Sequence, residues 1–256
     1  TVDLETYWAV GHSLTKMSPI AYCMHPDTEI ISCALKLDDG PTVVVFGEHA
    51  TRDILNDVDW SEYMLIGHNM SGFDAMILAW RFGIKPRLWG CTLAMARPVH
   101  AKDVELKLGA LVRHYKLGVK DQSVLMQTKG RNLCDFTEQE IEDMRMYNAA
   151  DVDQCYQLFS RLIAHTSPDE LRLIDMTIRM LVEPQFSADI NLLFNTLIDE
   201  EERKEKLLAE AARKMNLWDE FMDASEAAEK ALTVLSSAAK FATFLETLGV
   251  EVPTKI

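Results

Sequence analysis

The chain has 256 residues, of which 48% are hydrophobic and 26% are charged, and its formal net charge is −14. This composition is typical of a globular protein with one large domain or one domain and an extension. The acidic balance argues against a protein that coats nucleic acid through bulk positive charge. Five scattered cysteines without a Cys-x-x-Cys pair argue against a disulfide framework and against a zinc site.

No segment approaches the roughly 18 apolar residues of a membrane span. No basic, apolar leader precedes the first predicted element. We therefore expect a cytoplasmic protein without a membrane partner.

The chain opens on an alternation of apolar and acidic residues that is typical of a β-strand. In such a strand Val2 and Leu4 lie on one face, and Asp3 and Glu5 lie on the other, about 6.6 Å apart along the strand. Two like charges at this spacing repel unless a cation lies between them or water surrounds both. Asp3 and Glu5 are therefore candidate ligands for a hard divalent metal ion. An exposed edge strand with two solvated acids is the alternative.

Two further strands are predicted after a segment rich in turn-forming residues at 12–28. Strand patterns cover residues 30–37 and 42–46, and the Asp-Asp-Gly-Pro sequence between them favours a turn. With the opening strand they predict a three-stranded meander.

Helices and strands then alternate. The patterns predict a short helix at 53–58, a strand at 63–68, a helix at 71–82, a strand at 87–92, a helix at 106–115, and a long helix from 137 to about 165. Strands that come first and helices that follow predict an α/β fold with a mixed β-sheet and flanking helices.

The pattern from residue 167 onward is helical only, with helices predicted at 169–181, 191–217 and 224–248. We therefore divide the chain into residues 1–165, an α/β domain, and residues 166–256, an all-helical extension.

The long helix contains a carboxylate where its period calls for an apolar residue. Thr137 and Glu140 form a capping-box pattern at its start, and Asp151 interrupts the inward-facing stripe. A carboxylate in that place is costly unless it is paired or binds a metal ion. Tyr147 lies four residues earlier, so its hydroxyl points over the same pocket. Asp151 paired with a lysine, or capping a neighbouring backbone, is the alternative.

A third acidic position follows the strand at 63–68. Asp74 falls in the first turn of the next helix, where the helix dipole favours a negative charge. Asn69 or Ser71 is expected to cap this helix, and Phe73 is expected to pack inward. A purely structural role for all of these residues is the alternative.

The segment from Lys85 to Arg131 is basic although the chain is acidic. It holds ten lysines and arginines and three acids, a net charge of 10 − 3 = +7. Such a region can guide a polyanion toward an acidic site. A solvated, lysine-rich surface is the alternative.

Together these motifs resemble the DEDD superfamily of 3′–5′ exonucleases, in the subclass with Tyr-x-x-x-Asp. Asp3-Leu4-Glu5 matches the first motif, Asn69 to Phe73-Asp74 the second, and Tyr147-Asn148-Ala149-Ala150-Asp151 the third. Asn69 precedes Asp74 by five residues, where many relatives have four.

The chain looks most like the proofreading domain of a bacteriophage-type family A DNA polymerase, over essentially its whole length. Residues 22–30, 107–111 and 248–256 extend the resemblance beyond the site. It implies a ribonuclease-H-like mixed β-sheet, followed by a helical extension that leads toward a polymerase domain. It also implies that the protein acts in the host cytoplasm. Nothing resembles the polymerase's own palm motifs, so no DNA synthesis is expected. Because Thr1 begins almost inside the first strand, we expect a fragment or a trimmed stand-alone exonuclease.

The resemblance also implies a mechanism with two Mg²⁺ or Mn²⁺ ions about 4 Å apart. In it Asp3 bridges both ions, Glu5 and Asp151 complete the first, and Asp74 reaches the second directly or through water. Tyr147 and Glu5 orient the attacking water. The implied products are nucleoside 5′-monophosphates from a single-stranded DNA 3′ end.

The resemblance places three further residues on the substrate. Thr6 contacts the terminal 3′-hydroxyl, and Asn69 and Phe73 shape the pocket for the last nucleotides. Three alternatives stay open: an RNA 3′-end trimming nuclease with the same chemistry, a non-catalytic DNA-binding module, and a scaffold for a partner polymerase.

Overall fold

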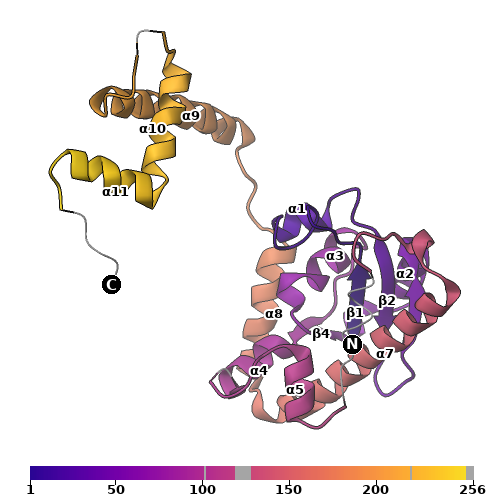
Figure 1. The fold of residues 1–256 in the computed structure, drawn as a ribbon. Helices are drawn as coiled ribbons and strands as arrows, with labels where there is room; N and C mark the ends of the chain where they lie inside the picture. Colours follow the sequence, from indigo (N-terminus) through magenta and orange to yellow (C-terminus); the bar gives the residue numbers. More distant parts are fainter. Residues whose placement is uncertain (101, 119–127, 220, 252–256) are drawn as a thin grey trace. The chain divides into compact units, whose positions relative to one another are not determined.

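The computed structural model describes residues 1–100, 102–118, 128–219 and 221–251 (Figure 1). They form two compact units, Thr1–Gln185 and Phe186–Ile256, and each unit is described by itself. Lys120 and Asp121 of the basic segment, and residues 252–256 of the tail, lie outside the described residues.

The first unit holds five strands within its described residues. They are β1 (Val2–Thr6), β2 (Ile30–Leu35), β3 (Val43–Phe46), β4 (Met64–Gly67) and β5 (Leu88–Cys91). β1, β2 and β3 form an antiparallel sheet in that order, which confirms the predicted meander. β4 and β5 pair in parallel, and β4 contacts β1. The mixed α/β fold class is therefore confirmed.

Helices cover these strands. Among its described residues, the helices of the first unit are α1 (Pro19–Cys23), α2 (Gly47–Asn56), α3 (Asp74–Trp80), α4 (Thr92–His100), α5 (Leu108–His114), α7 (Glu138–Leu162) and α8 (Pro168–Val182). Short 3₁₀ turns occur at Trp60–Glu62, Met70–Gly72, Leu133–Asp135 and Ile163–His165. The second unit contains α9 (Ile190–Lys214), α10 (Ala224–Leu235) and α11 (Ala238–Thr247). Within the described residues, no helix combines the length and the apolar character that a membrane span requires.

Helix α8 belongs to the first compact unit. Its residues Ile174, Ile178 and Val182 are buried in the main core, and it contacts β5. The sequence analysis starts the extension at residue 166, before α8, whereas the compact units divide after α8. The functional division of the chain into residues 1–165 and 166–256 stays a prediction.

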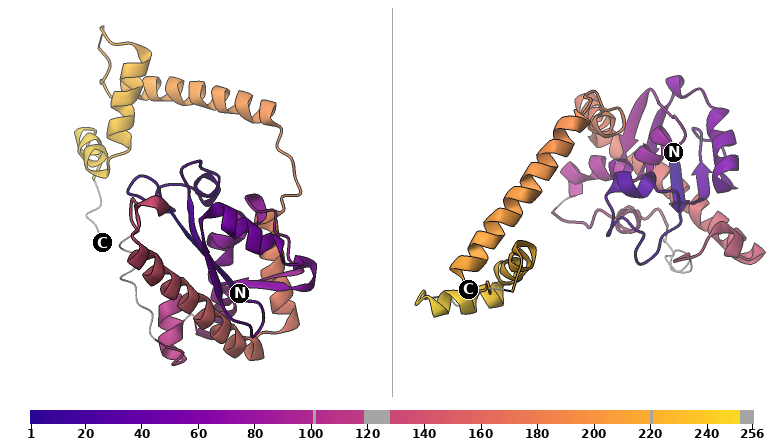
Figure 2. Two further views of the ribbon diagram at one scale, coloured as in Figure 1. Left: turned by 90° about the vertical axis from the view of Figure 1, so that its right-hand side faces the viewer. Right: turned by 90° about the horizontal axis from the view of Figure 1, so that it is seen from above.

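The central strand β2 is buried on both faces. Cys33 and Leu35 join Val2 and Leu4 in the main core, whereas Ala34 packs in a second cluster against α7. α7 contacts β1, β2 and β3 and runs along the sheet in Figure 1 and in the left view of Figure 2. The face of β1 that does not enter the main core is therefore the face toward α7.

Two helices were not predicted from the sequence. α1 lies in the segment that we expected to contain only turns, although Ser18 caps it and Pro19 occupies its first turn. α4 follows β5 directly and contains Pro98, which argues against a helix when it is judged by sequence pattern alone. α2 begins at Gly47, earlier than the predicted residue 53. All three are short amphipathic or interrupted segments that packing stabilises more than local propensity does.

The predicted capping box at the start of α7 is present. The Thr137 hydroxyl accepts from the Glu140 backbone N–H at 3.3 Å, and the Glu140 carboxylate accepts from the Thr137 N–H at 2.8 Å. Arg131 donates two hydrogen bonds to the same carboxylate, at 2.6 and 2.9 Å. The bonds from Arg131, followed by those from Thr137, lower the pKa of Glu140 to about 2.

We expect Thr137→Ala to lower the free energy of unfolding by about 1 kcal/mol, because the helix loses a side-chain cap. The melting temperature of the first unit should fall by roughly 2–4 °C, which thermal unfolding followed by circular dichroism will measure. Ser160→Ala, at an exposed position of the same helix where the hydroxyl bonds the Tyr156 carbonyl, should stay within about 0.5 kcal/mol. Equal losses in both variants would contradict a specific role for the cap.

Candidate active site

β1 presents Asp3 and Glu5 on the face that α7 covers. Val2, Leu4 and Thr6 are buried, and the two acids between them are half-buried. Asp3 pairs across the ladder with Ala34, and Glu5 pairs with Ser32. The period of two along the strand therefore sends both carboxylates away from the main core, as the sequence predicted.

α7 is held against this face by small and polar residues. Ala34, Val44 and Val152 are buried together, which lets the helix lie close to the sheet. The side-chain amide of Asn148 donates to the Ser32 hydroxyl at 2.8 Å. This bond fixes the rotation of the helix, and Asp151 lies nearly one turn further along the same buried stripe.

Three carboxylates meet between β1 and α7. One oxygen from each of Asp3, Glu5 and Asp151 lies within 4.8 Å of the other two. In the part of the chain that the structure describes, this is the one group of three or more histidines, cysteines or acids with ligand atoms so close together. Such a group repels itself unless protons or cations intervene. Its all-oxygen donor set suits a hard divalent cation such as Mg²⁺ or Mn²⁺.

Asp74 lies beside this group but is not a member of it. It begins α3 and is only 3% exposed. Its Oδ1 accepts a hydrogen bond from the backbone N–H of Leu4, at 3.2 Å, so the carboxylate approaches β1 between Asp3 and Glu5. Burial raises the pKa of Asp74 to about 7, against the opposing effect of the Leu4 hydrogen bond.

Tyr147 is buried next to the three carboxylates and is 7% exposed. Burial comes first among the causes that raise the pKa of Tyr147 far above its ordinary value, followed by the negative charges of Asp151 and Glu5. The phenol therefore keeps its proton at neutral pH and can donate a hydrogen bond.

Two of the three residues expected to contact substrate, Thr6 and Phe73, lie directly beside Glu5 and Asp74 in the sequence. The Thr6 hydroxyl is hydrogen-bonded to the Tyr22 hydroxyl at 2.8 Å and is 6% exposed. Phe73 packs partly buried against the core, with its ring 6.1 Å from that of Tyr22. Tyr22, a partner to both, entered the sequence analysis only as the start of the matching segment 22–30, which gave no signal for this contact.

The expected cap of α3 is wrong. Phe73 occupies the N-cap position, and no side chain there accepts a capping bond. Asn69 instead adopts a left-handed backbone conformation, with φ 68°, at the end of β4. A Cβ on Gly72 would lie 2.6 Å from the Asn69 side-chain nitrogen, so glycine leaves the room that the Asn69 side chain occupies.

His68 connects the second motif to two neighbouring segments, which the sequence did not reveal. Its Nδ1 lies 2.9 Å from the Thr92 hydroxyl, and its Nε2 lies 3.1 Å from the Leu106 carbonyl oxygen. A pocket of about 550 Å³ opens here, lined by His68, Asn69, Leu93, Glu105, Leu106, Lys107, Leu108 and Gly109. Asn69 is thus placed at the wall of a cavity.

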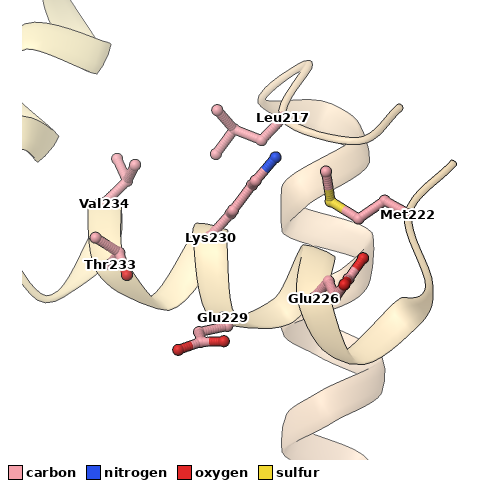
Figure 3. A pocket seen from close by; sticks show the side chains of 7 residues that line it. All are labelled: Leu217, Met222, Glu226, Glu229, Lys230, Thr233 and Val234. Carbon is pink, nitrogen blue, oxygen red and sulfur yellow. The ribbon is translucent and has the colours of Figure 1, made fainter. Parts of the chain in front are cut away.

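The second unit contains a separate pocket of about 550 Å³ (Figure 3). It is lined by Leu217, Met222, Glu226, Glu229, Lys230, Thr233 and Val234, all after α9. None of the predicted site residues lies in it.

Comparisons with known proteins bear on this site. A family model described as 3′–5′ exonuclease, from DNA polymerase A, matches residues 21–166. The match includes Asp74, Tyr147 and Asp151 and begins after β1. The chain is also similar to a DNA polymerase of Bacillus phage SP02, with 25% identity over 235 residues, which cover 83% of this chain.

The chain spans 35% of the length of that polymerase. No solved structure matches the chain. The matched family residues make up more than half of the sequence. The chain therefore belongs to the 3′–5′ exonuclease family of the A-type DNA polymerases.

Proposed function

We propose that this chain is a two-metal 3′–5′ exonuclease that removes nucleoside 5′-monophosphates from the 3′ end of single-stranded DNA. In a parent polymerase this activity would proofread newly made DNA. The observation that carries the proposal is the meeting of Asp3, Glu5 and Asp151 within 4.8 Å in a chain of an exonuclease family. Residues 1–165 would form the exonuclease domain, and residues 166–256 would lead toward the polymerase domain.

The family uses divalent cations, and the acids of this chain fit them. Asp3, Glu5 and Asp151 would hold the ions together with Asp74, whose buried carboxylate approaches the same strand through the Leu4 N–H. Bound Mg²⁺ or Mn²⁺ lowers the pKa of water and stabilises the charge that develops on a phosphodiester. The protein's part is to fix the ligand oxygens and to bury them in a site of restricted water access.

Tyr147 and Glu5 would orient the attacking water. Since the pKa of Tyr147 is raised far above its ordinary value, its hydroxyl keeps its proton and donates a hydrogen bond. Glu5, half-buried on the same face, accepts one. A donor and an acceptor on either side of the water fix its lone pair toward the phosphorus atom.

The 3′ end of the bound DNA would lie beside β1 and the start of α3. Thr6 follows Glu5 directly, and Phe73 precedes Asp74, so both are within one residue of a proposed ligand. Asn69 lines the neighbouring pocket. Apolar and aromatic contacts of this kind bind single strands without sequence preference.

Tyr147→Phe is expected to lower kcat about 10- to 100-fold, the usual loss when a residue that orients a reacting group is removed. KM should change little, because the phenol does not bind the strand. Steady-state kinetics on a labelled oligonucleotide will measure both constants. Tyr156→Phe on the same helix, where the hydroxyl donates to Asp39, should keep wild-type kinetics. A Tyr147→Phe variant with unchanged kcat would contradict the orienting role.

The decisive experiment compares matched single-stranded DNA and RNA oligonucleotides, labelled at the 5′ end, in Mg²⁺, Mn²⁺ and EDTA. The proposal expects a ladder that shortens from the 3′ end of DNA, release of 5′-monophosphates, and no reaction in EDTA. Faster shortening of RNA would turn the assignment toward RNA trimming. No shortening of either strand in either metal would overturn the catalytic proposal and leave a binding module or a scaffold.

A further inference from the structure

The loop after β1 holds a tryptophan in a fixed orientation, three residues beyond Glu5. The indole N–H of Trp8 donates to the Thr128 hydroxyl at 3.0 Å, and the Trp8 carbonyl accepts from the Gly130 N–H at 2.7 Å. Trp8 is half-buried, whereas Thr128 is 3% exposed. The two bonds therefore anchor a partly exposed aromatic ring on a buried support, close in sequence to Glu5.

A lysine accompanies the ring. The Lys129 ammonium lies 5.6 Å from the centre of the Trp8 ring, and Lys129 is exposed. Within the described residues it makes no ion pair, whereas nearby Arg131 is held by Glu140 through two hydrogen bonds. Lys129 is thus an exposed positive charge that an incoming phosphate can reach.

The pocket next to Tyr7 is unsuitable for phosphate. Tyr7 lines a pocket of about 450 Å³ together with His12, Pro26, Asp27, Glu29, Asn132 and Cys134. Two carboxylates in this lining repel a polyanion. A DNA strand that extends from the acidic site is therefore more favourably bound next to Trp8 and Lys129.

We propose that Trp8 stacks on a base of the bound strand, at the third nucleotide from the 3′ end, and that Lys129 contacts its phosphate. This inference rests on the proposed function. Three residues span at most roughly 10 Å, about the rise of three stacked nucleotides, which sets the position. A base stacked on an aromatic ring is worth more than an exposed cation–π contact. The base therefore displaces Lys129 from the ring, and the ammonium moves to the phosphate.

The test measures how oligodeoxythymidylates of two to eight nucleotides bind to the protein and how fast they are degraded. Binding is followed by fluorescence anisotropy of a 5′ label in EDTA, and KM and kcat are measured in Mg²⁺. For wild type, KM should fall between two and four nucleotides and then level off. Trp8→Ala should raise KM and Kd about 5- to 150-fold for the longer strands, leave the dinucleotide unaffected, and leave kcat unchanged.

Trp8→Phe is the matched variant, because it keeps an aromatic face and loses only the indole N–H. It should restore most of the affinity. Lys129→Ala should reduce the slope of log Kd against log salt concentration by about 0.7, the value for one phosphate contact with a single strand. Lys240→Ala, which removes an exposed lysine from α11, outside the basic segment, should leave the slope as it is.

The two proposals can fail separately. If wild type degrades DNA but Trp8→Ala has wild-type KM and Kd, or raises them equally for the dinucleotide, the stacking role is wrong and the exonuclease stands. If the length-dependent binding needs Trp8 but no nucleotide is released in Mg²⁺ or Mn²⁺, the stacking role stands and the catalytic proposal is wrong. A lowered melting temperature shared by Trp8→Ala and Trp8→Phe, without rescue of binding by phenylalanine, overturns the stacking role in favour of a structural one.

Discussion

Replacing Asp151 by asparagine is expected to slow nucleotide release at least about a thousandfold. The change keeps the size of the side chain and removes one negative charge from the three carboxylates that meet within 4.8 Å. Loss of a single fixed group that stabilises transition-state charge commonly costs a hundred- to a thousandfold in rate. The rate loss on removing a direct metal ligand should lie at or beyond the upper end of that range. Single-turnover degradation of a labelled single-stranded DNA in Mg²⁺ will measure the loss.

The matched control is Asp143→Asn, which removes a carboxylate from the same helix two turns earlier, where it accepts a bond from Gln139. It should retain wild-type activity. The double variant Asp3→Asn with Asp151→Asn should be no slower than the slower single variant. The rate losses from removing groups that act as one unit are not additive. Additive losses, or an Asp151→Asn variant with more than a tenth of wild-type activity, would show that these acids do not share a site.

Metal binding is expected to produce the second large effect, a rise in the melting temperature of the first unit. A ligand that binds only the folded state, at about 100 times its Kd, adds about 2.7 kcal/mol to the free energy of unfolding. For a unit of this size that amounts to roughly 5–10 °C. Without metal the carboxylates on β1 and α7 repel one another, so bound cations both add contacts and relieve that repulsion. Calorimetry in EDTA, Mg²⁺ and Mn²⁺ will measure the shift.

The Asp151→Asn variant distinguishes specific metal binding from a general effect of ionic strength. Asp151→Asn should melt higher than wild type in EDTA, because one of the mutually repelling charges is gone, and should gain less from metal. Sodium chloride at matched ionic strength should not reproduce the wild-type shift. An equal metal shift in wild type and Asp151→Asn would place the bound ions elsewhere on the protein.

Local patterns predicted the elements that carry the acids. The alternation around Asp3 and Glu5 gave β1, and Thr137 with Glu140 gave the start of α7. These signals succeed because the period of a strand and the cap of a helix depend on residues a few positions apart. The cap expected at Asn69 failed because the turn after β4 takes a left-handed conformation there. Capping preference alone does not reveal that conformation.

The sequence by itself determined on which face of its element each carboxylate lies, since that follows from periods of 2 and 3.6 residues. Only the tertiary structure decided which faces meet and how closely. The bond between Asn148 and Ser32 joins residues 116 positions apart, and that between Leu4 and Asp74 spans 70. The same holds for Trp8 and Thr128, 120 positions apart. Contacts of this range are set by how the helices pack on the sheet, and no local pattern encodes them.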